Sequence, residues 1–159
     1  MRPTGFFAVA LSLFISCEMA AAQTDASKPN PKFDAALAKK YGANENGMRT
    51  YVLAILKTGT AKFAPGKERD EIFKGHFANI KRLAVEGKLV VAGPFDSNSS
   101  GLRGIFILNA STVEEARKLT DTDPVVKSGL MAVDHYLWYG SAALMAIPEI
   151  HEKISRAVP

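Results

Sequence analysis

The sequence predicts an α+β domain in which four strands form one antiparallel sheet and two helices cover one of its faces. Two observations carry this prediction. Four short segments are rich in apolar, β-branched and aromatic residues, and a longer amphipathic segment follows the first and the third of them. The order strand-helix-strand-strand-helix-strand, or βαββαβ, is the split arrangement of ferredoxin-like folds.

The predicted strands are bounded by glycine, proline and polar residues, which are typical of turns. Pro94 ends the second strand because proline has no backbone N–H to donate to a sheet. The polar stretch 96–101 (DSNSSG) predicts a hairpin turn between the second and third strands. The four strands are predicted over 50–57 (TYVLAILK), 88–92 (KLVVA), 103–108 (RGIFIL) and 130–139 (LMAVDHYLWY).

The first helix, predicted over 68–85, places a histidine on its core-facing side. Ile72, His76, Ile80 and Leu83 are spaced by four, four and three residues, so they share one face of the helix. Histidine changes its protonation state near neutral pH, which makes an imidazole on this face a candidate for acid–base chemistry. A satisfied core histidine is the alternative that the pattern leaves open.

The second helix is predicted to begin at Ser111 or Thr112. Glu114 follows Ser111 by three residues, which is the pattern of a capping box. The loop after this helix contains Asp123 directly before a proline, and that proline favours an extended backbone at Asp123. From the residues alone, Asp123 is either a turn or cap residue or a carboxylate that folds toward the first helix.

The face of the sheet opposite the helices is predicted to meet a second copy of the chain. The first, third and fourth strands carry apolar or aromatic residues at both parities, whereas a solvated sheet face is polar. Asp134 and His135, adjacent on the last strand, point to opposite faces. A homodimer with its sheets packed face to face, or closed into a barrel, would cover the apolar residues of that face.

Residues 1–22 predict a secretory signal peptide. Arg2 supplies a positive start, 6–15 (FFAVALSLFI) is a short apolar run, and three consecutive alanines offer a cleavage site. Because this run is too short to span a membrane, we expect an exported protein, periplasmic or secreted, that begins near Gln23. The alternative is a lipoprotein signal in which Cys17 becomes the lipid-bearing first residue.

The remaining chain divides into three predicted parts. Residues 23–47 are rich in Ala, Lys, Asn and Asp and predict a flexible tether with one weak helix over 31–41. The compact domain is predicted over 48–140. Residues 141–159 contain a helical pattern interrupted at Pro148 and predict a helical C-terminal extension.

Composition argues against several classes of function. The formal charge is +4, and the basic residues alternate with acidic ones instead of clustering beside aromatics, so we do not expect nucleic-acid binding. No segment after the leader is long and apolar enough to cross a membrane. With Cys17 as the one cysteine and three histidines in all, a dedicated zinc site is not expected.

Four motifs occur together between residues 48 and 139. They include a histidine on a helix, a strand that ends in A-G-P and a D-P-x-x-x-x-G segment, in a fixed order. Together they resemble the YciI-like (YCII-related) family. The stretches that carry the resemblance are 51–57, 76–80 (HFANI) with Leu83, 87–95 (GKLVVAGPF) and 123–130 (DPVVKSGL).

The resemblance implies a dimeric α/β barrel and a small enzyme that uses no cofactor. It also implies a catalytic pair, His76 and Asp123, in a pocket between helices and sheet, acting on a small polar or cyclic substrate as a lyase or isomerase. One relative of this type is a dehydrochlorinase of a chlorinated hydroxyquinol. The leader and the C-terminal extension depart from the family pattern. A non-catalytic dimer that binds a small-molecule ligand, or serves an accessory role, is the alternative.

Asp96 and Tyr51 are two further candidates, both for substrate binding. Asp96 follows the G-P-F end of the second strand and would line the mouth of a pocket, or else serve as a turn residue. Tyr51 lies in the first strand and would contact a substrate, or else belong to the core or an interface.

Overall fold

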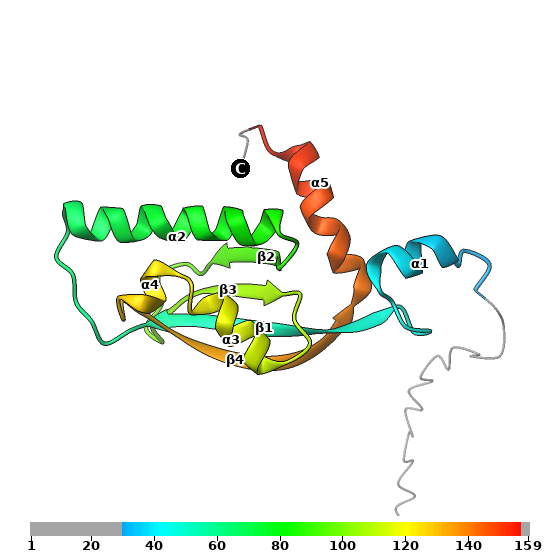
Figure 1. Ribbon diagram of the computed structural model, residues 1–159, viewed down its shortest axis with the longest axis horizontal. Helices are drawn as coiled ribbons and strands as arrows, with labels where there is room; N and C mark the ends of the chain where they lie inside the picture. The colour runs from blue at the N-terminus through cyan, green and yellow to red at the C-terminus, as the bar shows by residue number, and fades with distance from the viewer. Residues whose placement is uncertain (1–29, 157–159) are drawn as a thin grey trace, which may run out of the picture. The chain divides into compact units, whose positions relative to one another are not determined.

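The computed structural model describes residues 30–156, and from Asp34 onward they belong to one compact unit (Figure 1). The predicted signal peptide over 1–22 and the alternative lipid site at Cys17 lie outside the described residues. Within the described residues, no helix is both long enough and apolar enough to cross a membrane.

The four predicted strands form one sheet, and every neighbouring pair runs antiparallel. The strand order β2-β3-β1-β4 confirms the ferredoxin-like βαββαβ arrangement. The two central strands, β1 and β3, pair on both sides, and the edge strands β2 and β4 pair on one side only. The strands are β1 (Met48–Thr58), β2 (Leu89–Pro94), β3 (Leu102–Leu108) and β4 (Met131–Ser141).

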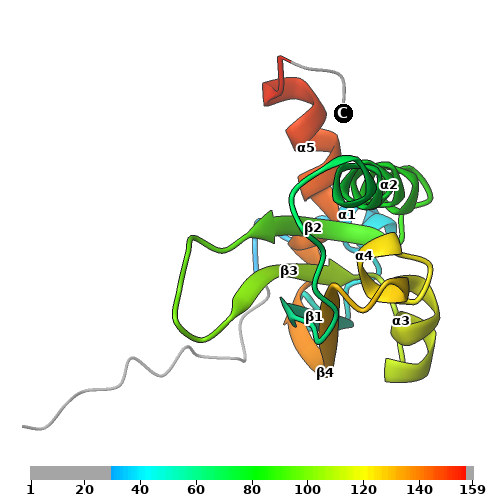
Figure 2. The same ribbon diagram turned by 90° about the vertical axis from the view of Figure 1, so that its left-hand side faces the viewer.

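Three helices lie on the same side of this sheet, as Figure 2 shows. Their apolar side chains pack on the residues of β1, β3 and β4 that point toward them, and this layer is the main core. Among its fully buried members, Val52 lies in β1 and Leu108 lies in β3. Leu83 lies in the long helix over 67–85. The helices are α2 (Lys67–Val85), α3 (Val113–Thr120) and the short α4 (Pro124–Lys127).

The cap of α3 lies one residue later than the predicted capping box. Thr112 has an extended backbone, and its hydroxyl accepts a hydrogen bond from the backbone N–H of Glu115 at 3.1 Å. The Glu115 carboxylate in turn accepts from the backbone N–H of Ser111 at 3.0 Å. The pair that caps the helix is therefore Thr112 with Glu115, because the chain turns into the helix after Thr112.

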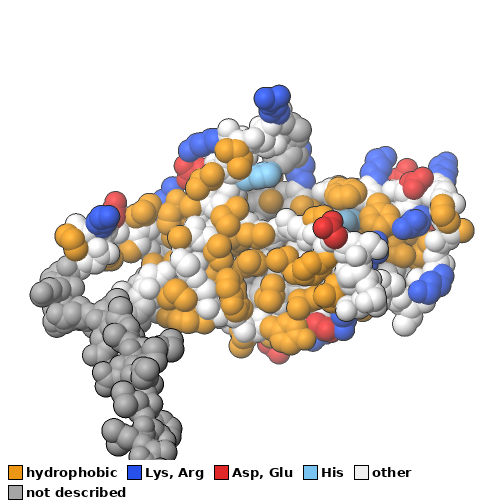
Figure 3. Space-filling view, turned by 180° about the vertical axis from the view of Figure 1, so that it is seen from behind, with side chains coloured by type: hydrophobic (Ala, Val, Ile, Leu, Met, Phe, Trp, Pro, Cys, Tyr) orange, Lys and Arg blue, Asp and Glu red, His pale blue; other side chains and the backbone are white. Residues whose placement is uncertain are grey.

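The opposite face of the sheet is covered at one end only. Leu144 and Met145, from the 3₁₀ helix η1 (Ala142–Ala146), pack over the buried cluster around Tyr51. Farther along, Tyr136 and Trp138 of β4 keep 51 % and 37 % of their surface exposed. Figure 3 shows apolar side chains gathered over this face of the molecule.

The segment before β1 contains the weak helix that was expected over 31–41, and from Asp34 onward it belongs to the compact unit. Residues 34–47 form α1 (Ala35–Tyr41) with a turn behind it. Lys40 of α1 makes a 3.0 Å ion pair with Glu149, which lies in the C-terminal helix α5 (Ile147–Ile154). None of the residues of α1 is buried, so the segment lacks the apolar pattern by which sequence indicates packing.

Candidate active site at His76 and Asp123

Helix α2 directs the imidazole of His76 against β3, as the spacing of its apolar residues predicts. The residue is 8 % exposed, and its ring stacks on Phe106 with centroids 6.1 Å apart. Phe73 meets the ring edge-on at 6.3 Å, and Phe77 lies at a tilt 5.4 Å away. Three phenyl groups therefore lie around the imidazole.

Asp123 is fully buried at the start of α4. Its backbone is extended, as the following proline favours, and its Oδ1 accepts a hydrogen bond from the backbone N–H of Val125 at 3.1 Å. Pro124 occupies the first turn of α4, where a missing N–H costs nothing. Asp123 is thus a helix cap, which is one of the two roles that the sequence left open. Its Oδ2 takes no part in the cap and can bind another side chain.

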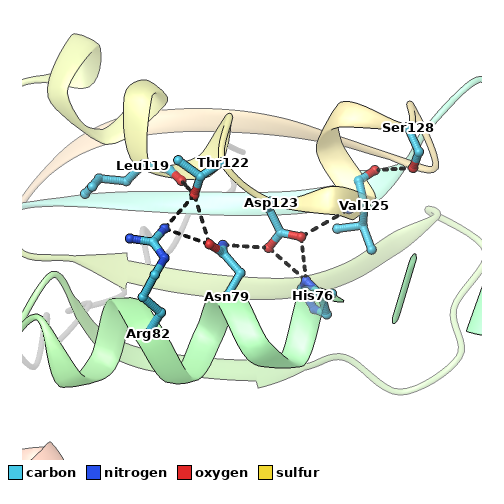
Figure 4. A network of polar contacts seen from close by, with 8 residues as sticks. All are labelled: His76, Asn79, Arg82, Leu119, Thr122, Asp123, Val125 and Ser128. Carbon is cyan, nitrogen blue, oxygen red and sulfur yellow. Dashed lines mark hydrogen bonds and ion pairs between the residues drawn. The ribbon is translucent and has the colours of Figure 1, made fainter. Parts of the chain in front are cut away.

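The structure brings His76 and Asp123 together although 47 positions separate them in the chain. Nδ1 of His76 lies 2.8 Å from Oδ2 and 3.0 Å from Oδ1 of Asp123 (Figure 4). The carboxylate also accepts from the side-chain amide of Asn79 at 3.3 Å. Because an ionised carboxylate only accepts, Nδ1 must carry the proton, and Nε2 of the neutral ring carries the lone pair.

Nε2 of His76 is the end of this pair that stays unbonded. It makes no hydrogen bond within residues 30–156. The one buried side-chain polar atom without a partner in that range is Nδ1 of His135, so Nε2 of His76 is within reach of solvent. An accessible basic nitrogen whose ring is held by a buried carboxylate is the arrangement of a general base.

A polar network behind Asp123 holds the pair in place. The side-chain carbonyl of Asn79 accepts from Nη2 of Arg82 at 2.8 Å. The hydroxyl of Thr122 lies 2.9 Å from the same oxygen and 2.7 Å from the Leu119 carbonyl, and its one proton serves both. With its oxygen facing these donors, the Asn79 amide directs its NH₂ group at Asp123. Arg82 is itself held by Glu86 at 2.9 Å. Figure 4 shows Arg82, Asn79 and His76 in line along α2, with Thr122 and Asp123 facing them.

Sequence reasoning assigned no role to Asn79, Arg82 or Thr122. The signal that was present is the three-residue spacing of His76, Asn79 and Arg82, which places polar side chains along one side of α2. The contribution of Thr122 depends on how the loop folds, and no local pattern indicates that.

Gly75 allows α4 to approach α2 closely enough for the pair to form. A Cβ atom at this position would lie 2.8 Å from Cγ of Pro124, a distance that real contacts almost never reach. The structure shows that the close neighbour is the proline that follows Asp123.

Comparison with known proteins identifies the domain that carries this site. The family model of the YCII-related domain matches residues 48–137, more than half of the chain. The chain belongs to the YCII-related family. This confirms the resemblance seen in the motifs around His76 and Asp123.

Two known proteins are similar to this chain. The uncharacterized protein YjpA of Bacillus subtilis (strain 168) is 33 % identical over 82 residues, which are 52 % of this chain and 85 % of YjpA. A solved structure of 5-chloro-2-hydroxyhydroquinone dehydrochlorinase (TftG) from Burkholderia phenoliruptrix AC1100, in complex with 2,5-dihydroxybenzoquinone, is 23 % identical. It covers 55 % of this chain and 92 % of its own, with a TM-score of 0.38.

The other two site candidates of this YCII-related domain are not brought to His76. Tyr51 is fully buried on the opposite face of the sheet, where its hydroxyl donates to the backbone carbonyl of Ser141 at 2.9 Å. Asp96 is exposed in the loop after β2, and its backbone carbonyl accepts from the side chain of Asn98. The structure therefore favours the core alternative for Tyr51 and the turn alternative for Asp96.

His135, on β4, makes a different set of contacts. Its Nε2 lies 2.9 Å from the hydroxyl of Thr120, and that hydroxyl donates to the carbonyl of Arg117. The hydroxyl must therefore accept from Nε2–H, which leaves the buried Nδ1 without a proton or a partner in the described residues. Burial, reinforced by the charge of Arg117, lowers the pKa of His135 from its usual 6.5.

Asp134, the residue before His135, pairs with a lysine of the neighbouring strand. Asp134 points to the other face of the sheet, where it forms an ion pair with Lys57 of β1 at 2.5 Å. Within residues 30–156, no group of three or more His, Cys, Asp or Glu side chains is placed to hold a metal ion.

Proposed function

We propose that this protein is an exported, cofactor-independent enzyme of the lyase or isomerase type, with His76 as its general base and acid. One observation carries the proposal: Nδ1 of His76 is bound to a buried carboxylate while Nε2 stays unpaired and reachable. Both His76 and Asp123 lie within the part of the chain that the YCII-related family model matches.

The proposed reaction begins when Nε2 of His76 removes a proton from a carbon or hydroxyl of the substrate. The positive charge that develops on the ring is stabilised by Asp123, which also keeps the ring oriented. In a lyase the electron pair left by the proton forms a double bond and expels a leaving group from the neighbouring carbon. In an isomerase the imidazolium returns the proton to a different atom of the same substrate.

The surroundings of the ring favour a small, flat, cyclic substrate. Phe73, Phe77 and Phe106 present apolar ring surfaces around His76, and such surfaces stack well on planar molecules. A polar group on the substrate would then meet Nε2.

We further propose that the exported protein is a homodimer. The uncovered part of the sheet carries half-buried Leu53, Ile55 and Ile105 next to the exposed rings of β4. A continuous apolar sheet face of this kind is covered in stable proteins.

The proposal of export rests on the predicted leader over residues 1–22. Mass spectrometry of the mature N-terminus tests it: a start at Gln23 supports cleavage, and a lipid on Cys17 supports the anchor.

The function is tested by a ligand screen followed by turnover measurements. A panel of small hydroxylated, keto and halogenated ring compounds is screened for thermal shifts of the full-length mature protein. Hits are then assayed for turnover with wild type, His76→Gln and the matched variant His135→Gln. We expect turnover to be lost in His76→Gln alone. Hits that shift the melting temperature and are never converted would instead support the non-catalytic binding alternative.

A further inference from the structure

A hollow lies between α2, β2 and α5, apart from the pair of His76 and Asp123. Its volume is about 450 Å³, which is within the range of small-molecule sites. Figure 1 shows α5 beside the C-terminal end of α2, with β2 next to both. Phe77 and Val85 of α2 form one wall, and Ile147 and Pro148 of α5 form the other. His76 does not line this hollow.

One wall of the hollow is an addition to the family domain. The YCII-related match ends at residue 137, whereas α5 begins at Ile147. A domain that stopped after β4 would leave α2 and the edge of β2 as an open surface. In this chain the C-terminal extension encloses that surface, so the hollow is a property of this chain and not of the YCII-related domain as such.

The walls of the hollow expose large apolar side chains to solvent. Phe77 is 64 % exposed and Val85 is 81 % exposed, although neighbouring positions of α2 are buried in the core. Side chains of this size at one concave place gain free energy when an apolar molecule covers them. The body of the expected ligand is therefore apolar.

The polar groups at the rim set the charge of the ligand. Lys81 stands on the α2 side and Glu152 on the α5 side, and neither forms an ion pair within the described residues. A charged ligand would be attracted to one wall and repelled by the other, whereas an uncharged one meets no such conflict. His151 at the rim, and the free backbone edge of β2, offer hydrogen bonds.

We propose that this hollow, named the α2–α5 pocket, binds an uncharged and mostly apolar small molecule that carries one or two hydrogen-bonding groups. This site is separate from His76 and does not depend on the proposed function. Because Phe77 contacts both the pocket and the ring of His76, its occupant lies one side chain away from the catalytic pair.

The test is a fluorescence titration of the full-length mature protein with N-phenyl-1-naphthylamine, an uncharged apolar probe. Ala84 lines the pocket on α2, and Ala84→Phe fills it. Ala78 is exposed on the same helix outside the pocket, so Ala78→Phe is the matched control. We expect saturable binding whose Kd rises at least about tenfold in Ala84→Phe and less than about twofold in Ala78→Phe.

A charged probe and an active-site variant serve as controls. The probe 8-anilino-1-naphthalenesulfonate has the same rings and one negative charge, and we expect it to bind no more tightly than the uncharged probe. His76→Gln should bind the uncharged probe like wild type. Thermal unfolding of each variant checks that it is folded, and Ile147→Glu provides a second disruption of the pocket should Ala84→Phe not fold.

Any of three results would overturn the proposal. The first is the absence of saturable binding by folded protein. The second is equal binding by wild type, Ala84→Phe and Ile147→Glu, which would place the probe elsewhere, such as on the open sheet face. The third is a sulfonated probe that binds about tenfold more tightly than the uncharged one. Loss of turnover in His76→Gln with probe binding intact would separate this site from the active site.

Discussion

Nδ1 of His76 lies 2.8 Å from Oδ2 of Asp123, in a contact that joins the middle of α2 to the cap of α4. The carboxylate is fully buried, and its other partners are the Val125 backbone N–H and the Asn79 amide. Every donor is therefore accounted for, and the proton of the neutral imidazole is assigned to Nδ1. This single contact fixes which nitrogen of His76 is free to react.

The two internal histidines should be opposite tautomers. Asp123 holds the proton of His76 on Nδ1, whereas Thr120 holds that of His135 on Nε2. Long-range ¹H–¹⁵N NMR at a pH where both rings are neutral distinguishes the two forms. In Asp123→Asn the new amide can donate to Nδ1, so His76 should change to the Nε2–H form while His135 stays unchanged.

The same substitution should reduce catalysis. With Nε2 protonated, His76 cannot accept a proton from the substrate, and kcat/KM for a substrate found in the screen should fall by roughly 10²–10⁴-fold. A decrease of less than about tenfold in a variant that shows the changed tautomer would mean that Nε2 is not the base.

Gly75→Ala should destabilise the fold and loosen the site. The new methyl group would lie 2.8 Å from the rigid ring of Pro124, so α4 must shift away from α2. Overpacking of this kind costs about 1–3 kcal/mol in the free energy of unfolding, which urea titration measures. At Gly93 nothing lies within 4 Å of an added Cβ, so Gly93→Ala is the control and should change stability by less than about 0.5 kcal/mol. Equal effects of the two variants would contradict the packing role.

Stability should decrease with acidity because of His135. Burial, the largest cause, and the charge of Arg117 lower the pKa of this histidine, while Asp121 and Asp134 oppose them. The unfolded chain therefore takes up a proton near pH 6.5 that the folded chain resists. The contribution to stability is complete above that pH and is lost as the pH falls below it.

Urea unfolding at about pH 8 and about pH 5 measures this contribution. Wild type should lose more stability between the two conditions than His135→Gln, which has no titrating ring. If the two proteins lose the same amount, another group is responsible for the acid sensitivity.

The open face of the sheet should control the oligomeric state. Tyr136 points to that face opposite Leu53, whereas the next residue, Leu137, points to the helix side and is also exposed. We expect Tyr136→Glu to convert a dimer to a monomer in sedimentation experiments, because it would place a charge in an apolar interface. Leu137→Glu on the same strand should leave the dimer intact. A wild-type protein that sediments only as a monomer would contradict the proposed dimer.

The sequence by itself determined the elements and the face on which His76 lies. Apolar runs between turn residues predict each of the four strands to within two residues at either end, because strand formation and burial both follow from local composition. The spacing of Ile72, Ile80 and Leu83 fixes the buried side of α2 and hence the direction of His76. The family motifs added the expectation that Asp123 is its partner.

Tertiary structure decided what lies beside His76. Asn79, Arg82 and Thr122 form their network only after α4 has docked on α2, and that docking depends on the fit of Gly75 to Pro124. Tyr51 illustrates the same limit, since alternation along a strand separates two faces without stating which one meets the helices. Contacts between residues far apart in the chain depend on how whole elements pack, and no local pattern encodes that packing.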